Sequence, residues 1–373
     1  MADTRSAKHA ILFYGGFAFR SGGAFMHTTT LSQGLRARGW TVTTITLDNL
    51  PWPLRYVPHV VAALVNKVAA PLGFYYKGIL TGALYKFFIK RRSTDLLVFE
   101  DIYLGWNSSN PTVSVLHAVW SDNLQSYAVA EDEIAKLKRK EVEAINSRSH
   151  PVITVSQRYK EFLENAHFRD SGTISLDVVE LGLDVDAIRA REKPLPPKHA
   201  RSLIYCGALE ARKNVYFMLD VFKHIAAADP LATLTIVGDG PDQEGLKQYA
   251  AEHRLNVAFL GRLTHDQVLD ELTRHNIYIH TALKESFSFA LLEAKLCGLT
   301  TCALASLEVP DEFVDLGFSG FDPADWSAQI LAIDGKPDMR GFPDYSIARM
   351  TDHTLALVSS SNHPAEASPI SPA

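Results

Sequence analysis

The chain has 373 residues, of which 47% are hydrophobic and 21% charged, and its formal net charge is −5. These proportions exclude a disordered chain, and the length allows two α/β domains of ordinary size. The slight acidic excess argues against a general polyanion binder, so no nucleic-acid partner is expected. The three cysteines, Cys206, Cys297 and Cys302, lack metal-ligand spacing and indicate reduced thiols in the cytoplasm.

The first half alternates apolar, strand-like runs with amphipathic helical stretches, a pattern typical of parallel sheets covered by helices. A helix is predicted at 25–38, ended by Gly39, and a long charged helix at 124–146. No run of 18 apolar residues predicts a spanning helix, and the run at 10–14 is too short for a signal peptide. Strands are predicted at 9–14, 41–47, 96–99, 112–116 and 152–155.

The second half repeats this alternation, so we predict two Rossmann-like domains, at 1–190 and 201–342. The segment 191–200 carries three prolines and several charges, which favours a semi-rigid linker. The segment 359–373 is rich in Ser, Pro and Ala and is predicted to be a disordered tail. Strands of the second domain are predicted at 202–205, 233–237, 257–260, 277–280 and 300–303.

One segment, 52–92, departs from this pattern because no acidic residue lies between Asp48 and Asp95. It is rich in aromatic residues, and its valines and Leu64 follow helical spacing. A basic, aromatic, amphipathic segment suits a surface of anionic lipid. Two ordinary helices packed on the first sheet, with their lysines in water, are the alternative. The basic residues expected at the membrane are Lys77, Lys86, Lys90, Arg91 and Arg92.

Two features of the first domain follow predicted strands. The glycine-rich loop at 15–23 lets a backbone approach a phosphate, although it lacks the dinucleotide-binding and P-loop spacings, and a simple turn fits it as well. His117 comes at the carboxyl end of a strand, the edge at which open α/β sheets bind ligands. It could polarise a hydroxyl or donate to a sugar oxygen, or it could be structural.

In the second domain, Arg212 and Lys213 follow a strand and could neutralise a departing diphosphate. A basic loop tip in solvent is the alternative. Further on, Glu285 and Glu293 are separated by seven residues, with Glu285 ahead of a predicted helix and Glu293 about two turns inside it. Such a helix start offers N–H groups to an anion between two acceptors for sugar hydroxyls. An amphipathic helix with two solvated glutamates is the bland alternative.

Taken in order, these features resemble retaining glycosyltransferases of family 4, also called glycosyl transferases group 1. The resemblance implies an α/β, GT-B fold, with two Rossmann-like domains facing a central cleft. It covers nearly the whole chain and is strongest at 202–312. The motifs that carry it are Gly22-Gly23, His117, 153–156, 182–184, Gly207 with 212–214, 238–241, 261–263, Glu285, Glu293, Gly298 and 309–312.

The resemblance also implies a role for each matching position. Glu285 would face the donor sugar, Glu293 would hold the ribose hydroxyls, and Lys213, helped by Arg212, would bind the diphosphate. Gly23 would approach the donor, and His117 would lie beside the transferred sugar and the acceptor. A helix at 343–358 would cross back to the N-terminal domain. The remaining donor positions are Gly238, Arg262 and Leu263, with backbone N–H groups from Ser288, Phe289 and Ala290.

The implied reaction is retaining transfer without a metal or bound cofactor, from a GDP- or UDP-linked sugar, with the basic side chains stabilising the departing diphosphate. With the basic segment, it favours a lipid-linked glycan acceptor on the inner face of the cell membrane, in polysaccharide or envelope glycan synthesis. A small soluble acceptor, or a membrane-docked partner without catalysis, are the alternatives. The chain departs from the family pattern at Ala208, often Arg, and at Ser286 and Ser288, usually Gly.

Overall fold

The computed structural model describes residues 8–18, 22–69, 71–124, 129–191, 201–335 and 337–361. The chain forms two compact units, the first comprising residues up to Leu183 and from Tyr345 onward, and the second Asp184–Asp344. Most of the expected linker at 191–200 and of the expected tail at 359–373 lies outside the described residues. The first three residues of that tail continue a helix that ends at Ser361.

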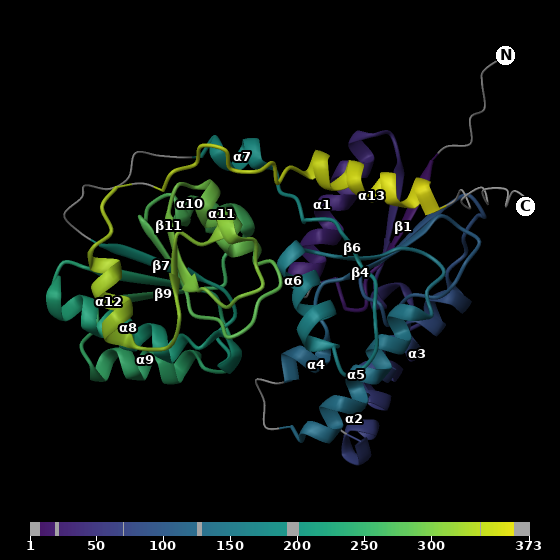
Figure 1. The fold of residues 1–373 in the computed structure, drawn as a ribbon, viewed down its shortest axis with the longest axis horizontal. Coiled ribbons are helices and arrows are strands. Elements are labelled where there is room, and N and C mark those ends of the chain that lie inside the picture. Colours follow the sequence, from purple (N-terminus) through teal and green to yellow (C-terminus); the bar gives the residue numbers. More distant parts are fainter. Residues whose placement is uncertain are drawn as a thin grey trace, which may run out of the picture. The chain divides into compact units, whose positions relative to one another are not determined.

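A six-stranded parallel sheet forms the centre of the first unit, with the order β2-β1-β3-β4-β5-β6 (Figure 1). Its strands match the predicted positions to within about two residues, apart from the short edge strand β6, which the sequence did not indicate. The bounds are β1 His9–Phe13, β2 Thr41–Ile45, β3 Leu96–Phe99, β4 Thr112–Leu116, β5 Val152–Thr154 and β6 Asp177–Val178.

The last helix of the first unit spans Ile347–Ser361, where 343–358 was expected, and the charged helix α5 begins at Glu131, not at residue 124. Three acidic residues occupy its first turn, where they favour the positive end of the helix dipole. A separate short helix precedes it, and residues 125–128 lie outside the described chain. The bounds are α1 Gly23–Ala37, α2 Val57–Ala69, α3 Leu72–Phe88, α4 Trp120–Asn123, α5 Glu131–Asn146, α6 Gln157–Phe162 and α13 Ile347–Ser361.

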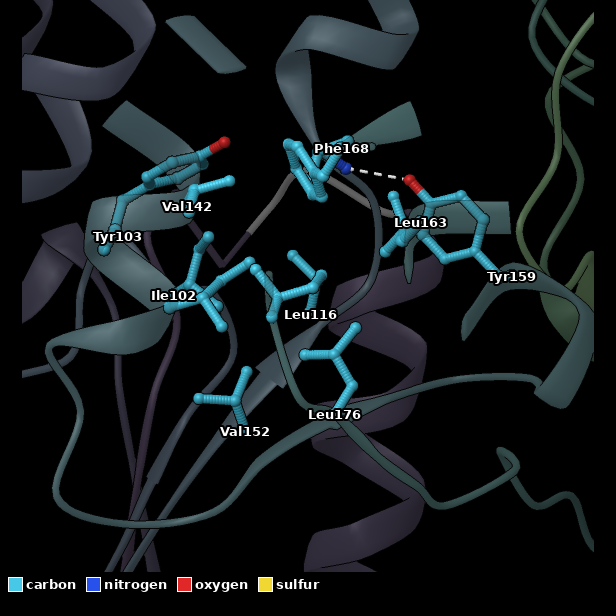
Figure 2. Packing of buried hydrophobic residues seen from close by; sticks show 13 residues of the cluster. Ile102, Tyr103, Leu116, Val142, Val152, Tyr159, Leu163, Phe168 and Leu176 are labelled. Carbon is cyan, nitrogen blue, oxygen red and sulfur yellow. Dashed lines mark hydrogen bonds between the residues drawn. The ribbon is translucent and has the colours of Figure 1, made fainter. Parts of the chain in front are cut away.

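Two apolar clusters hold the ends of β3 and β4. Around β4, Leu116, Leu163 and Phe168 pack with other buried side chains, and the Val119 N–H donates to the Tyr159 hydroxyl at 3.0 Å (Figure 2). At β3, Phe99 stacks on Phe13 with ring centroids 5.1 Å apart. Well-packed aromatic pairs resist displacement, so the residues that directly follow these strands start from fixed positions.

The second unit contains another six-stranded parallel sheet, in the order β12-β11-β10-β7-β8-β9. After β7 the chain runs outward through β8 and β9, and it then crosses to the other side of β7 to form β10. The direction of the strand order therefore reverses between β7 and β10, which is the switch point of the sheet. The strand bounds are β7 Ser202–Cys206, β8 Thr233–Val237, β9 Val257–Gly261, β10 Ile277–His280, β11 Thr300–Leu304 and β12 Leu316–Phe318.

The helices of the second unit connect these strands, as a doubly wound sheet requires. Two parallel sheets with helical connections confirm the α/β, Rossmann-like fold class. The edge strand β12 is three residues long and was not expected from the sequence. The helix bounds are α7 Val185–Arg189, α8 Val215–Ala228, α9 Gln243–Glu252, α10 His265–Leu272, α11 Phe289–Leu296 and α12 Pro323–Leu331.

Helix α13 follows the second unit in the sequence but belongs to the first, where it packs along α1 (Figure 1). Gly34 allows the close approach: a Cβ there would lie 2.0 Å from Thr351 Oγ1 and 2.8 Å from Ile347 Cγ2. Arg38 adds an ion pair with Asp352 at 2.7 Å. The contact between the helices therefore depends on the missing side chain of Gly34.

We expect Gly34→Val to lower the free energy of unfolding by about 1–3 kcal/mol, because overpacking forces α13 away from α1. Urea unfolding followed by circular dichroism measures the change. Gly320→Val is the control, since a Cβ at Gly320 meets nothing within 4 Å. Equal stability of the two variants would contradict the close packing of the two helices.

Candidate active site

The loops after β7 and β10 come together at the switch point of the second sheet. The loop after β7 ends in a short 3-10 turn, Ala211–Lys213, and Asn214 takes a left-handed φ of 51°. The Leu283 N–H donates to the Arg212 carbonyl at 3.0 Å, and the Thr281 hydroxyl donates to the Lys213 carbonyl at 2.9 Å. These two hydrogen bonds fix Lys213 beside the loop that carries Glu285.

Lys213 and Glu285 form a largely buried ion pair, with 11% and 16% of their side chains exposed. His280 Nε2 lies 3.4 Å from the same carboxylate oxygen. Burial alone would raise the pKa of Glu285, but the charge of Lys213 and the contact with His280 outweigh it and hold this pKa well below its usual range. Burial lowers the pKa of His280, which favours the neutral imidazole. The site therefore holds an ionised carboxylate and a lysine at one point.

Glu293 lies inside α11, the helix that follows the loop carrying Glu285. Helix α11 begins at Phe289, after Ser288 in a left-handed conformation with φ 66°, and the Leu291 N–H donates to the Ser288 hydroxyl at 3.4 Å. A non-glycine residue rarely takes this φ, so the helix start is constrained by its surroundings. The first N–H groups of α11, on Phe289 and Ala290, lack helical acceptors by their position.

His265 is a neighbour of Glu293 that the sequence interpretation missed. It begins α10 and lies 2.8 Å from Glu293 Oε1, and this hydrogen bond raises the pKa of His265. The Thr264 capping box orients the start of α10. A histidine two residues after the motif Gly261-Arg262-Leu263 was the available signal. Its position gives Glu293 a fixed partner, and the nearly buried carboxylate is held in place.

Three further predicted donor residues, Arg212, Arg262 and Gly238, have close neighbours within the second unit. Arg212 pairs with Glu210 at 2.6 Å, and Arg262 pairs with Asp239 at 3.0 Å. A Cβ at Gly238 would lie 1.9 Å from the Gly207 carbonyl oxygen, so close approach of two loops explains this glycine. Contact between these residues and a donor stays a prediction.

In the first unit, Glu100 and His117 directly follow the neighbouring strands β3 and β4. His27, in α1, places Nδ1 at 2.7 Å from Glu100 Oε2, and His117 places Nε2 at 3.0 Å from the same oxygen. Burial would raise the pKa of Glu100, but the two histidines lower it to about 2. Burial lowers the pKa of His117. Neither Glu100 nor His27 was singled out from the sequence, although Glu100 follows the strand next to that of His117.

Among the described residues, His27, Glu100 and His117 are the one group of three or more His, Cys, Asp or Glu residues whose ligand atoms all lie within 4.8 Å of one another. The two contacts inside the group have the lengths of hydrogen bonds. The expected absence of a metal stays a prediction. Gly23, expected to approach the donor, is the first residue of α1 in this same unit.

Two doubly wound units, each with charged side chains at the carboxyl ends of its strands, define the GT-B class of glycosyltransferases. The chain belongs to glycosyltransferase family 4: the family model described as Glycosyltransferase Family 4 matches residues 21–213, and that described as Glycosyl transferases group 1 matches 186–334. The resemblance stated from the sequence motifs is thereby confirmed.

The chain is similar to proteins of several substrate classes. Over 124 residues it is 32% identical to the phosphatidylinositol N-acetylglucosaminyltransferase gpi3 subunit of Schizosaccharomyces pombe, a match that covers 32% of this chain and 27% of the yeast protein. The matched part is thus about a quarter of that relative's length.

Two solved structures share the fold over nearly the whole chain. Sucrose-phosphate synthase from Thermosynechococcus elongatus has a TM-score of 0.64 at 15% identity and covers 95% of this chain and 96% of its own. HepE from Anabaena, solved in complex with UDP and glucose, has a TM-score of 0.56 at 16% identity, with coverage of 94% and 96%. At these identities the likeness concerns the fold.

We expect Lys213→Met to lower the free energy of unfolding by about 3 kcal/mol at pH 7, because it leaves the Glu285 carboxylate buried without its cation. The lowered pKa of Glu285 stabilises the fold above its ordinary value of 4.5, and this contribution is lost as the pH falls toward the folded pKa. The difference between wild type and variant should therefore shrink below about pH 4.5.

Urea unfolding at a series of pH values measures this difference, and a cycle with Glu285→Gln isolates the coupling of the pair. Lys247→Met is the control, since Lys247 pairs with the exposed Glu244 and should cost less than about 1 kcal/mol. Equal costs for the two lysines would show that the Lys213 pair is not a buried interaction.

Proposed function

We propose that this chain is a retaining, metal-independent glycosyltransferase that moves a sugar from a nucleoside diphosphate donor, GDP- or UDP-linked, to a lipid-linked glycan at the membrane surface. The observation that carries the proposal is the Lys213–Glu285 pair at the switch point of the second sheet. Ligands bind such sheets outside the carboxyl ends of the strands, at that point. There, the Lys213 cation suits the diphosphate of a nucleotide sugar, and the Glu285 carboxylate suits the hydroxyl groups of its sugar.

In the proposed reaction, Lys213 and Arg212 bind the diphosphate, and Glu285 accepts hydrogen bonds from sugar hydroxyls. The bond between the sugar C1 and the diphosphate oxygen breaks, and the acceptor oxygen forms a bond to C1 on the same face. The departing diphosphate takes the acceptor proton. Charge develops on the diphosphate, so basic groups fixed before the reaction stabilise the transition state. Glu285, ionised and tied to Lys213, is a binding group in this scheme rather than the nucleophile.

Two of the similar proteins support the choice of substrates. The HepE structure contains UDP and glucose, a nucleoside diphosphate and a sugar. The name of the fission-yeast relative describes transfer of N-acetylglucosamine to phosphatidylinositol, a membrane lipid. We extend both features to this chain: a nucleotide-linked sugar as the donor and a lipid-linked molecule as the acceptor.

The membrane part of the proposal is supported by the surface of α2, α3 and the segment before them, which we term the α2–α3 face. Val68 and Phe87 are 91% and 82% exposed, and Val60, Leu64 and Val68 follow one another at four-residue spacing on the outer side of α2. Ordinary helices packed on a sheet would bury such a stripe. The exposed large apolar side chains of this face are Trp52, Tyr56, Val60, Leu64, Val68, Tyr76, Ile79, Phe87 and Phe88.

The basic residues of the α2–α3 face differ in exposure, and Lys77, which was expected at the membrane, is only partly exposed. Arg91 lies over the Trp106 ring at 5.3 Å, and Arg92 pairs with Asp95 at 2.9 Å, so both have partners inside the unit. Lys67, Lys86 and Lys90 are exposed, and we assign contact with anionic lipid chiefly to these three. In the described parts of the chain, no helix combines the length and the apolar character needed to cross a bilayer. The proposal requires only that the α2–α3 face contact the surface of the membrane.

Glu285→Gln should lower the rate of sugar transfer by roughly 100- to 1000-fold, because the amide keeps the shape but loses the charge that orients donor and lysine. The measurement is release of nucleotide across a panel of UDP- and GDP-sugars, with and without lipid-linked acceptor. Glu244→Gln, at an exposed glutamate of the same unit, should leave the rate unchanged. If Glu285→Gln supported the full cellular phenotype, a partner without catalysis would be the correct description.

Reversing the three exposed lysines (Lys67→Glu, Lys86→Glu and Lys90→Glu together) should weaken binding to vesicles of anionic lipid by roughly 100-fold, because each basic residue near the surface contributes about 1 kcal/mol. Vesicle flotation measures the bound fraction. The matched control reverses three exposed basic residues outside the α2–α3 face, Lys136, Arg139 and Lys223, and should bind as wild type. Equal binding by both variants would disprove the membrane role of this face.

A further inference from the structure

The group formed by His27, Glu100 and His117 joins three elements of the first unit: α1, the end of β3 and the end of β4. One carboxylate oxygen, Glu100 Oε2, lies within hydrogen-bond distance of a ring nitrogen from each histidine. The side chains of His27 and Glu100 are fully buried, whereas 17% of His117 is exposed. Only His117 can therefore meet a ligand directly.

The positions of the protons follow from the charge of Glu100. An ionised carboxylate only accepts hydrogen bonds, so both ring nitrogens that face it carry a proton. These are Nδ1 of His27 and Nε2 of His117. His27 Nε2 is buried and has no hydrogen-bond partner, so a second proton there would be an unpaired donor in the interior.

The same carboxylate selects one of the two neutral forms of His117. With the proton on Nε2, the lone pair is on Nδ1, and the ring accepts a hydrogen bond through that atom. The opposite tautomer would turn a lone pair toward the Glu100 oxygen, and the two would repel each other. Burial disfavours the doubly protonated ring, as the lowered pKa of His117 indicates. One tautomer of His117 therefore predominates.

We propose that Glu100, held by His27, is a positioning residue for sugar transfer, which fixes His117 as a hydrogen-bond acceptor for a hydroxyl of the transferred sugar or the acceptor. The part played by His117 rests on the proposed function, whereas the tautomer rests on the contacts of the first unit alone. His27 completes the arrangement because it takes up the second lone pair of the shared oxygen and prevents rotation of the buried carboxylate.

The tautomer can be tested by a spectrum of the wild-type chain, independently of activity. Nitrogen-15 NMR of the full chain labelled at histidine distinguishes a protonated ring nitrogen from one with a lone pair, and substitution of each histidine assigns the signals. The expected result at neutral pH is a protonated Nε2 and an unprotonated Nδ1 for His117, and the reverse for His27. A proton on Nδ1 of His117 would overturn the proposal, whatever the activity of the protein.

The functional part is tested with Glu100→Gln, which keeps the shape of the side chain but can donate as well as accept. We expect His117 to lose its single tautomer and kcat for transfer to fall by roughly 10- to 100-fold, with little change in KM for the donor. Glu271→Gln is the matched control, since Glu271 is a glutamate of the second unit that contacts a histidine, His275, at 3.3 Å. It should alter neither kcat nor the His117 spectrum.

The outcomes separate the two proposals. A changed tautomer with an unchanged kcat would overturn the positioning role of Glu100 and leave the transferase intact. Absence of transfer by the wild type with every donor would refute the proposed function, while the NMR result would still decide the tautomer. A metal ion shown to be bound by the ring nitrogens of His27 and His117 that face Glu100 would also overturn the proposal, because metal binding requires lone pairs, not protons, on those atoms.

Discussion

Both groups of candidate site residues, one in each unit, depend on one constraint, the parallel order of the strands in each sheet. Parallel strands end at the same edge, so residues far apart in the sequence become neighbours when they follow adjacent strands. Lys213 and Glu285 follow β7 and β10, and Glu100 and His117 follow β3 and β4. In both units a carboxylate thereby meets a nitrogen base across two strand ends. The sheet thus fixes the strand ends from which these side chains start, and short loops carry the chain from there to each residue.

The two buried carboxylates, Glu285 and Glu100, have different neighbours and hence different chemistry. Glu285 is opposed by the Lys213 cation. In the proposed function, the donor diphosphate would compete with Glu285 for this cation. Glu100 is opposed by two imidazoles, each of which turns a protonated ring nitrogen toward it. The first arrangement responds to the charge of a ligand, and the second sets the direction of a hydrogen bond. Both carboxylates stay ionised, because each finds donors that outweigh the loss of water.

Much of the fold was predictable because buried parallel strands are continuous apolar runs. The runs at 96–99, 112–116, 233–237 and 277–280 coincide with β3, β4, β8 and β10. The edge strands β6 and β12 escaped notice, because two or three residues are too few to show a pattern. Lys213, Glu285 and His117, whose roles stay predictions, were singled out from the sequence through motif order. Glu100, His27 and His265 were not, because their importance lies in partners brought close by the tertiary structure. No local pattern encodes such a contact.

The docking of α13 on α1 also has a consequence for synthesis of the chain on the ribosome. Gly34 and Arg38 contact residues 347 to 352, so their partners are translated after the entire second unit. While that unit is being made, the surface of α1 around Gly34 stays uncovered. The first unit is thus completed last although it begins first, and a chain cut at the boundary after Leu183 would present α1 without its covering helix.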